Sequence, residues 1–179
     1  ALINTNVSGQ PLYYSLGISQ ANNLILGSEL SENFSTTSDE TKSNFNTWIQ
    51  GDYNDSNYFE DLDQCLDDLS ADKPEIDYKI TNDDDALYIY TSGTTGNPKA
   101  ATISHKRLRL MMLGFKGAIQ PNKNDRVYNV LPLYHSAGGV IAVGLALTSG
   151  ASLVLKRKFS VNEFWDDVHK YKVTIFQYI

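Results

Sequence analysis

Cysteine is nearly absent from this chain of 179 residues, in which Cys65 is the single example. An intramolecular disulfide needs a pair of cysteines, and metal centres of the multi-cysteine kind need several, so the sequence excludes both. Disulfides are typical of oxidising compartments. We therefore expect a protein of a reducing compartment, such as the cytoplasm.

Positive charge and long apolar runs are also scarce. The 15 Lys and Arg residues are outnumbered by 21 Asp and Glu residues, which gives a net charge of −6. Apart from a short cluster at residues 156–158, the basic residues are scattered, so the sequence lacks the basic patch that nucleic-acid binding needs. The most apolar stretch, residues 137–147, is far shorter than the roughly 20 residues that cross a bilayer. We expect no nucleic-acid partner and no transmembrane helix in this sequence.

The most informative segment is residues 90–99, which read YTSGTTGNPK. Gly93 and Gly96 allow backbone angles closed to other residues, so that consecutive amide N–H groups can converge on an anion. Pro98 fixes the exit of the turn, and Lys99 adds a point charge for phosphate oxygens. Further hydroxyl donors come from Thr91, Ser92, Thr94 and Thr95. This composition predicts a polyphosphate-binding loop, and the alternative is an ordinary Gly/Ser/Thr surface loop.

The sequence around this loop favours phosphate binding. Residues 86–90 (ALYIY) form an apolar run typical of a buried strand, and residues 100–103 form a second, shorter one. Ser104 then stands where a helix N-cap belongs. A Walker A loop differs, because there a glycine precedes the lysine and a helix begins at once. In this chain Pro98 precedes Lys99, so the loop is predicted to join two strands.

From residue 86 onward the predicted strands and helices alternate. Ser160 and Glu163 have the spacing of a capping box at the start of the last helix. The alternation predicts an α/β fold in which layered, mostly parallel sheets carry helices on both faces and ligands bind beyond the strand ends. Strands are expected at residues 86–90, 100–103, 126–131, 152–155 and 173–176, with helices that begin near 105, 137 and 161.

The first half of the chain has weaker patterns. Pro11 suits the first turn of a short helix that ends before Ala21, and residues 24–26 predict a buried strand. Residues 31–57 are rich in Ser, Thr, Asn and Asp, which predicts a surface excursion with weak structure. A further amphipathic helix is predicted from its apolar positions Phe59, Leu62, Leu66 and Leu69.

These motifs resemble those of a known family. TSGTTGNPK is similar to the phosphate-binding motif of the adenylate-forming (AMP-binding) superfamily, and LPLYHSAGG at residues 131–139 is similar to the next motif of that superfamily. With INTN near the start and VTIFQYI at the end, the chain looks most like fatty acid transport proteins and very-long-chain acyl-CoA synthetases. The resemblance implies a partial large domain, truncated at both ends. Residues 1–80 would be its N-terminal portion, and 81–179 its phosphate-loop and acyl-pocket portion.

The resemblance also implies roles for single residues. Lys99 would stabilise the departing pyrophosphate, while Thr94 or Thr95 would reach Mg²⁺. His135 would be the second catalytic residue with Lys99, and would lie near the carboxylate or the α-phosphate. The β- and γ-phosphates of ATP would be held by Thr91, Ser92, Gly93, Thr94, Thr95, Gly96 and Lys99. The acyl substrate would be contacted by Tyr134, His135, Gly138 and Gly139.

The residues of the second motif, taken alone, are also compatible with purely structural roles. A single histidine beside an apolar run is often a core or surface residue, so His135 has an ordinary alternative. Tyr134 is explained almost as well as a half-buried aromatic residue at a strand end. Helix packing explains Gly138 and Gly139 nearly as well as space for an acyl chain does.

The implied activity is that of an acyl-CoA synthetase. Such an enzyme converts a long-chain fatty acid and ATP to an acyl-adenylate and pyrophosphate, and then passes the acyl group to coenzyme A. The resemblance implies a parent protein in the cytoplasm, or peripherally on a membrane facing it, and an isolated chain without turnover. The alternatives are an adenylation enzyme that loads a carrier protein, and a non-catalytic protein of fatty-acid transport or binding that keeps the ATP motif.

Overall fold

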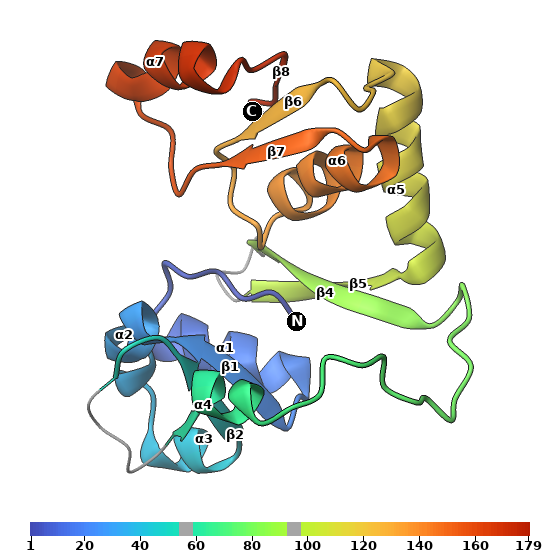
Figure 1. The fold of residues 1–179 in the computed structure, drawn as a ribbon. Helices are drawn as coiled ribbons and strands as arrows, with labels where there is room; N and C mark the ends of the chain where they lie inside the picture. The colour runs from blue at the N-terminus through green and yellow to red at the C-terminus, as the bar shows by residue number, and fades with distance from the viewer. Residues whose placement is uncertain (54–58, 93–97) are drawn as a thin grey trace. The chain divides into compact units, whose positions relative to one another are not determined.

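The computed structural model describes residues 1–53, 59–92 and 98–179 of the chain. They form two compact units, which are coloured by chain position in Figure 1. Unit 1 comprises Ala1, Ile3–Lys79 and Tyr90–Ala100, and unit 2 comprises Leu2, Ile80–Ile89 and Ala101–Ile179. Within the described ranges, no helix combines the length and the apolar character needed to cross a membrane.

Unit 1 is built on a three-stranded parallel sheet in the order β1–β2–β3. Asn23 lies opposite Asn46, and Trp48 lies opposite Glu60. The strands are β1 (Asn23–Gly27), β2 (Asn46–Gln50) and β3 (Glu60–Asp61). The helices are α1 (Gly9–Ser19), α2 (Ser31–Ser35), α3 (Asp39–Ser43) and α4 (Leu62–Asp67), with a 3₁₀ turn at Ser28–Leu30.

The core of unit 1 lies between α1 and this sheet. Leu12 and Leu16, which are one turn apart on α1, pack with Leu26 of β1 and Phe34 of α2. The Tyr90 hydroxyl donates a hydrogen bond of 2.6 Å to the Ser15 carbonyl oxygen of α1. This bond fixes the chain next to the predicted phosphate loop, because Tyr90 comes just before Thr91 in the sequence.

In the first half of the chain, the structure differs from two of the predictions made from the sequence. Residues 31–57 were expected to have weak structure, but their described part contains α2, α3 and the central strand β2. The reason is that Phe34 and Ile49 are buried and hold this segment in the unit. The helix predicted from Phe59 to Leu69 is also shorter than expected, because α4 begins only at Leu62 and ends at Asp67. Its apolar side is not well buried, since Leu66 is 52% exposed.

Unit 2 contains a second parallel sheet, in which β6 (Arg126–Asn129) lies between β7 (Ser152–Leu155) and β8 (Ile175–Phe176). Val127 of β6 is fully buried with Leu145 and Ala142. The helices are α5 (His105–Ile119), a π-helix (Ser136–Ala142), α6 (Val143–Ser149) and α7 (Val161–Tyr171). The parallel pairing and the alternation of strands and helices confirm the predicted fold class.

Helix α5 begins as the sequence predicts. The Ser104 hydroxyl accepts a hydrogen bond of 3.3 Å from the Arg107 amide, which satisfies one of the unpaired donors at the helix start. Met111 and Met112 of α5 pack against the core formed by Ile89, Ile103 and Val140. This core holds β4 (Asp85–Ser92) and β5 (Pro98–Ser104), which form a two-stranded sheet.

Helix α7 is held by a buried polar network instead of the predicted capping box. The Tyr128 hydroxyl donates a bond of 2.7 Å to Asp167, and the Lys156 ammonium lies 2.8 Å from the same carboxylate oxygen. Glu163 also pairs with Lys156, at 3.1 Å, and the Ser160 side chain makes no capping bond. The capping-box prediction is therefore wrong, because Glu163 binds the ammonium group instead.

Candidate functional site

The predicted phosphate loop connects β4 and β5, as the sequence indicates. Ser92 is the last residue of β4, and Pro98 is the first residue of β5. Gly93, Thr94, Thr95 and Gly96 were predicted to hold phosphate but lie outside the described residues. Their roles, and the Mg²⁺ contact of Thr94 or Thr95, stay predictions.

Thr91 and Lys99 stand at the base of this loop. The Thr91 hydroxyl donates a long hydrogen bond of 3.5 Å to the Lys99 carbonyl oxygen, so the side chain ties the two strands together. Lys99 is exposed, and within the described part of the chain no carboxylate forms a salt bridge with it. The ammonium group is thus available to an anion that binds at the loop.

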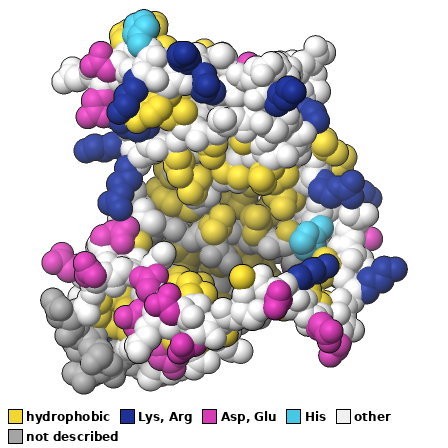
Figure 2. Space-filling view, in the orientation of Figure 1, with side chains coloured by type: hydrophobic (Ala, Val, Ile, Leu, Met, Phe, Trp, Pro, Cys, Tyr) yellow, Lys and Arg dark blue, Asp and Glu magenta, His cyan; other side chains and the backbone are white. Residues whose placement is uncertain are grey.

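The charge of unit 1 makes Lys99 unusual. Unit 1 holds 14 acidic residues and 4 basic ones, whereas unit 2 holds 7 acidic residues and 11 basic ones. Figure 2 shows acidic side chains gathered over α4 and the segment that follows it. Lys99 is therefore one of the few positive charges of unit 1 that could offset this net negative charge for an anion.

Tyr134 and His135 stand on a tight turn that follows β6. The His135 amide donates a bond of 3.1 Å to the Pro132 carbonyl oxygen, and the Gly139 amide donates one of 2.8 Å to the His135 carbonyl oxygen. The ring centroids of Tyr134 and His135 are 4.7 Å apart. His135 is exposed and sits at the N-cap of the π-helix, where its side chain makes no capping bond. Its imidazole therefore has nitrogen atoms to offer to a ligand.

Gly138 and Gly139 allow this turn to pack directly on the π-helix. A Cβ atom at Gly138 would come closer than 3.0 Å to the carbonyl oxygens of Leu131 and Pro132, and one at Gly139 would do the same to Leu133. Only glycine fits such a close approach of backbone to backbone. Packing thus accounts for both glycines, and their contact with an acyl chain stays a prediction. Single π-turns inside helices are frequent at functional sites.

Asn129, the last residue of β6, was not identified from the sequence. It has no exposed surface, and its Oδ1 atom accepts a hydrogen bond of 3.1 Å from the Leu131 amide. Among the described residues, its Nδ2 atom finds no partner. The available signal was a polar residue that follows Val127 and Tyr128, two positions before the second motif begins.

The predicted site residues fall into two groups. Tyr134, His135, Gly138 and Gly139 are brought together within one segment of unit 2, and Thr91 and Lys99 within unit 1. The grouping follows the two sequence motifs. The second motif therefore has a defined local geometry, whereas only the residues that flank the centre of the first motif are described.

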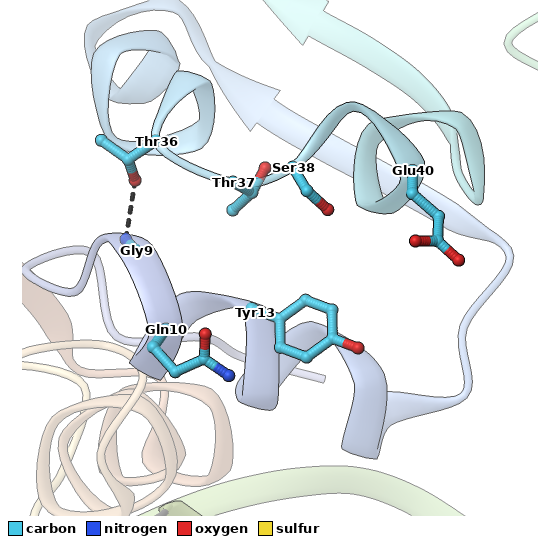
Figure 3. Close-up of a pocket in the computed structure, with 7 residues that line it drawn as sticks. All are labelled: Gly9, Gln10, Tyr13, Thr36, Thr37, Ser38 and Glu40. Atoms are coloured by element: carbon cyan, nitrogen blue, oxygen red, sulfur yellow. Dashed lines mark hydrogen bonds between the residues drawn. The ribbon is translucent and has the colours of Figure 1, made fainter.

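A polar pocket in unit 1 involves none of the predicted residues. It has a volume of about 420 Å³ and lies between α1 and the turn that joins α2 to α3 (Figure 3). Amide donors at a helix start often lack a partner, but the Gly9 amide of α1 already donates to the Thr36 hydroxyl at 2.6 Å. The Glu40 carboxylate also lines the pocket, which disfavours a phosphate there. The lining residues are Gly9, Gln10, Tyr13, Thr36, Thr37, Ser38 and Glu40.

Comparison with curated proteins finds relatives along the whole chain. Long-chain fatty acid transport protein 1 is 38% identical in Rattus norvegicus and 40% identical in Homo sapiens, each over 183 aligned residues that cover 100% of this chain. The chain spans 28% of the length of these relatives. Long-chain fatty acid transport protein 3 from Mus musculus is 50% identical over 96 residues, which are 54% of this chain and 14% of that protein.

Solved structures share the fold. The N-terminal domain of FACL13 from Mycobacterium tuberculosis superposes with a TM-score of 0.80 at 24% identity, covering 97% of this chain and 42% of that one. A protein from Rhodopseudomonas palustris that has been assigned as a long-chain-fatty-acid CoA ligase superposes with a TM-score of 0.80 at 20% identity. The match covers 99% of this chain and 43% of that one. The family model for AMP-binding enzymes matches residues 2–179. The chain therefore belongs to the AMP-binding enzyme family.

Proposed function

We propose that this chain is the part of an acyl-CoA synthetase that holds the phosphates of ATP and contributes to the acyl site. The complete protein would join a long-chain fatty acid to ATP, release pyrophosphate, and transfer the acyl group to the thiol of coenzyme A. Relatives named for long-chain fatty acid transport support the choice of acid. A neighbour of the same fold, o-succinylbenzoate CoA synthetase from Bacillus subtilis, has been solved with ATP and a magnesium ion.

The observation that carries this proposal is the exposed Lys99 at the base of a loop rich in glycine and threonine. A carboxylate can approach the α-phosphate only if the negative charge of the triphosphate is screened. Lys99 supplies a compact positive charge at the exit of the loop, and Thr91 ties the two ends of the loop together. In this proposal Lys99 binds the β- and γ-phosphates and stabilises the pyrophosphate as it leaves.

His135 has a separate role in the proposed reaction. Its imidazole is exposed at the N-cap of the π-helix, and a ring N–H can donate to oxygen atoms that gain charge as the acyl-phosphate bond forms. Tyr134 lies against the ring and restricts its orientation. Mg²⁺, when bound to the phosphates, would neutralise further charge, and the hydroxyl groups of Thr94 and Thr95 are the proposed protein ligands.

The complete protein is proposed to lie in the cytoplasm or on a membrane surface that faces it. The one cysteine, Cys65, is exposed and unpaired, which agrees with a reducing compartment. Coenzyme A, and not a carrier protein, is the proposed acyl acceptor because neighbours of the same fold are named as a long-chain-fatty-acid CoA ligase and an o-succinylbenzoate CoA synthetase. Acyl-CoA formation by the purified complete protein, without an added carrier protein, would test this choice.

The test of the proposed function is pyrophosphate exchange in the complete protein. Lys99→Ala is expected to lower the fatty-acid-dependent exchange rate by about 100-fold, because one fixed charge on the phosphates is lost. Lys106→Ala is the matched control, since Lys106 is an exposed lysine on α5 outside the loop. Equal rates for Lys99→Ala and Lys106→Ala would contradict the proposed role of Lys99. A wild-type protein without fatty-acid-dependent exchange would favour a protein that keeps the motif without catalysis.

A further inference from the structure

The turn that presents His135 is fastened to the sheet through one buried side chain. Asn129 is fixed as the last residue of β6, where its carbonyl oxygen accepts a hydrogen bond of 3.0 Å from the Lys156 amide. Its side-chain Oδ1 accepts the Leu131 amide at 3.1 Å. An asparagine that binds the backbone two residues ahead mimics a backbone turn and sets the direction of the chain. Asn129 therefore determines where Leu131 leaves the sheet.

A chain of close contacts leads from Leu131 to His135. The carbonyl oxygens of Leu131 and Pro132 lie against Gly138, where no Cβ atom would fit. The Pro132 oxygen then accepts the His135 amide at 3.1 Å. Because these contacts leave little space, a shift of Leu131 would move the backbone of His135 as well.

The amide side chain of Asn129 lowers the stability of the folded protein. The Nδ2 atom of Asn129 is buried and finds no partner among the described residues, and burying an unpaired donor is unfavourable. An apolar side chain of the same shape would avoid this penalty. The contact that only a polar side chain supplies here is the bond from the Leu131 amide to Oδ1.

We infer that Asn129 is a positioning residue, which sets the place of His135 through the turn that begins at Leu131. The inference about geometry stands on the contacts above, and its consequence for catalysis rests on the proposed function. In adenylation, His135 would act on oxygen atoms whose charge develops in the transition state. Its displacement should therefore lower kcat and leave the KM for ATP almost unchanged.

Three variants of the complete protein separate positioning from stability. Asn129→Leu removes the acceptor while keeping the shape, and we expect kcat to fall about tenfold with little change in the KM for ATP. Asn129→Asp keeps an oxygen acceptor, whether or not it is ionised, and should restore most of kcat. Tyr128→Phe removes the neighbouring buried hydrogen bond to Asp167 without touching the turn. It should lower Tm at least as much as Asn129→Leu and leave kcat unchanged.

A second measurement tests the geometry without relying on activity. The rate at which diethylpyrocarbonate modifies His135, measured by mass spectrometry, depends on the surroundings of the ring, and His105 at the start of α5 serves as an internal reference. The rate ratio of His135 to His105 should change severalfold in Asn129→Leu and return toward the wild-type ratio in Asn129→Asp. Tyr128→Phe should leave the ratio unchanged.

The outcomes distinguish this inference from the proposed function. A wild-type protein without pyrophosphate exchange would contradict the proposed function, while the modification ratios would still report on Asn129. An unchanged His135 ratio in Asn129→Leu overturns the inference, whatever the activity. If the wild type is active and Asn129→Leu keeps its full kcat, the catalytic part of the inference is overturned.

Discussion

Replacing Gly139 by alanine is expected to lower the free energy of unfolding of unit 2 by about 3 kcal/mol, the upper range for overpacking a core. The added Cβ atom would collide with the backbone carbonyl of Leu133. A flexible side chain could move aside, but this carbonyl belongs to the turn that presents Tyr134 and His135. Either the turn or the π-helix must shift, so the damage should concentrate at the candidate site.

The measurement uses urea unfolding of the 179-residue chain. A Trp48→Phe background leaves Trp165 on α7 as the single tryptophan, so its fluorescence reports unit 2. Gly117→Ala is the matched control, because a Cβ atom at this position would meet no described atom within 4 Å apart from its chain neighbours and the backbone of α5 itself. Alanine there should stabilise the helix by up to about 1 kcal/mol. Equal effects of the two substitutions would contradict the packing argument.

The strands of unit 2 could be predicted because their signals are local. The apolar residues Leu153–Leu155 are bounded by Ser152 and Lys156, and the structure places β7 on the predicted residues Ser152–Leu155. Ser104 likewise caps α5 through its own hydroxyl. Both features depend on residues within a few positions in the sequence, so no knowledge of distant contacts was needed.

The predictions that failed depended on distant partners. Glu163 has the spacing to reach back to Ser160, but Lys156 from the preceding strand end offers its carboxylate an ion pair. Residues 31–57 are polar on average, yet their few apolar members, such as Phe34, are buried in unit 1. Composition therefore underestimated the structure of this segment.

The candidate site was predicted only in part for the same reason. The types and order of Lys99, Tyr134 and His135 point to the chemistry, because they follow from two local motifs. The need for glycine at position 139 and the role of Asn129 arise from contacts between separate turns of the backbone. Such contacts leave no periodic signal in the sequence.

The second large effect concerns the buried network beneath α7. Hydrogen bonds from Lys156, which contributes most, and from Tyr128 hold the pKa of Asp167 below its ordinary value of 3.8. Burial, and then the hydrogen bond to Asp167, raises the pKa of Tyr128 to about 12. The folded state thus favours the ionised form of Asp167 and the neutral form of Tyr128.

Asp167→Asn is expected to destabilise unit 2 strongly at pH 7 and progressively less as the pH falls toward and below the ordinary carboxyl pKa of 3.8. A carboxylate with a lowered pKa in the folded state stabilises the protein above its unfolded pKa, and this contribution is lost as the pH falls through the folded pKa. The difference in the free energy of unfolding between the wild type and Asp167→Asn should therefore shrink as the pH falls below about 5. The measurement is the free energy of unfolding of both chains at several pH values, read from Trp165.

Asp166→Asn separates this network from the general effect of removing an acid. Asp166 is the exposed neighbour of Asp167 on α7, so its substitution should change stability by less than about 0.5 kcal/mol.

The dependence of stability on pH above 10 gives an independent check. Stability that depends on a neutral Tyr128 is present below pH 10 and is lost as the pH rises toward about 12. Without the Asp167 carboxylate the Tyr128 pKa should fall, so this alkaline loss should be smaller in Asp167→Asn. A stability difference between wild type and Asp167→Asn that stays constant from pH 7 to pH 3 would show that the ionised carboxylate is not what holds α7 to the sheet.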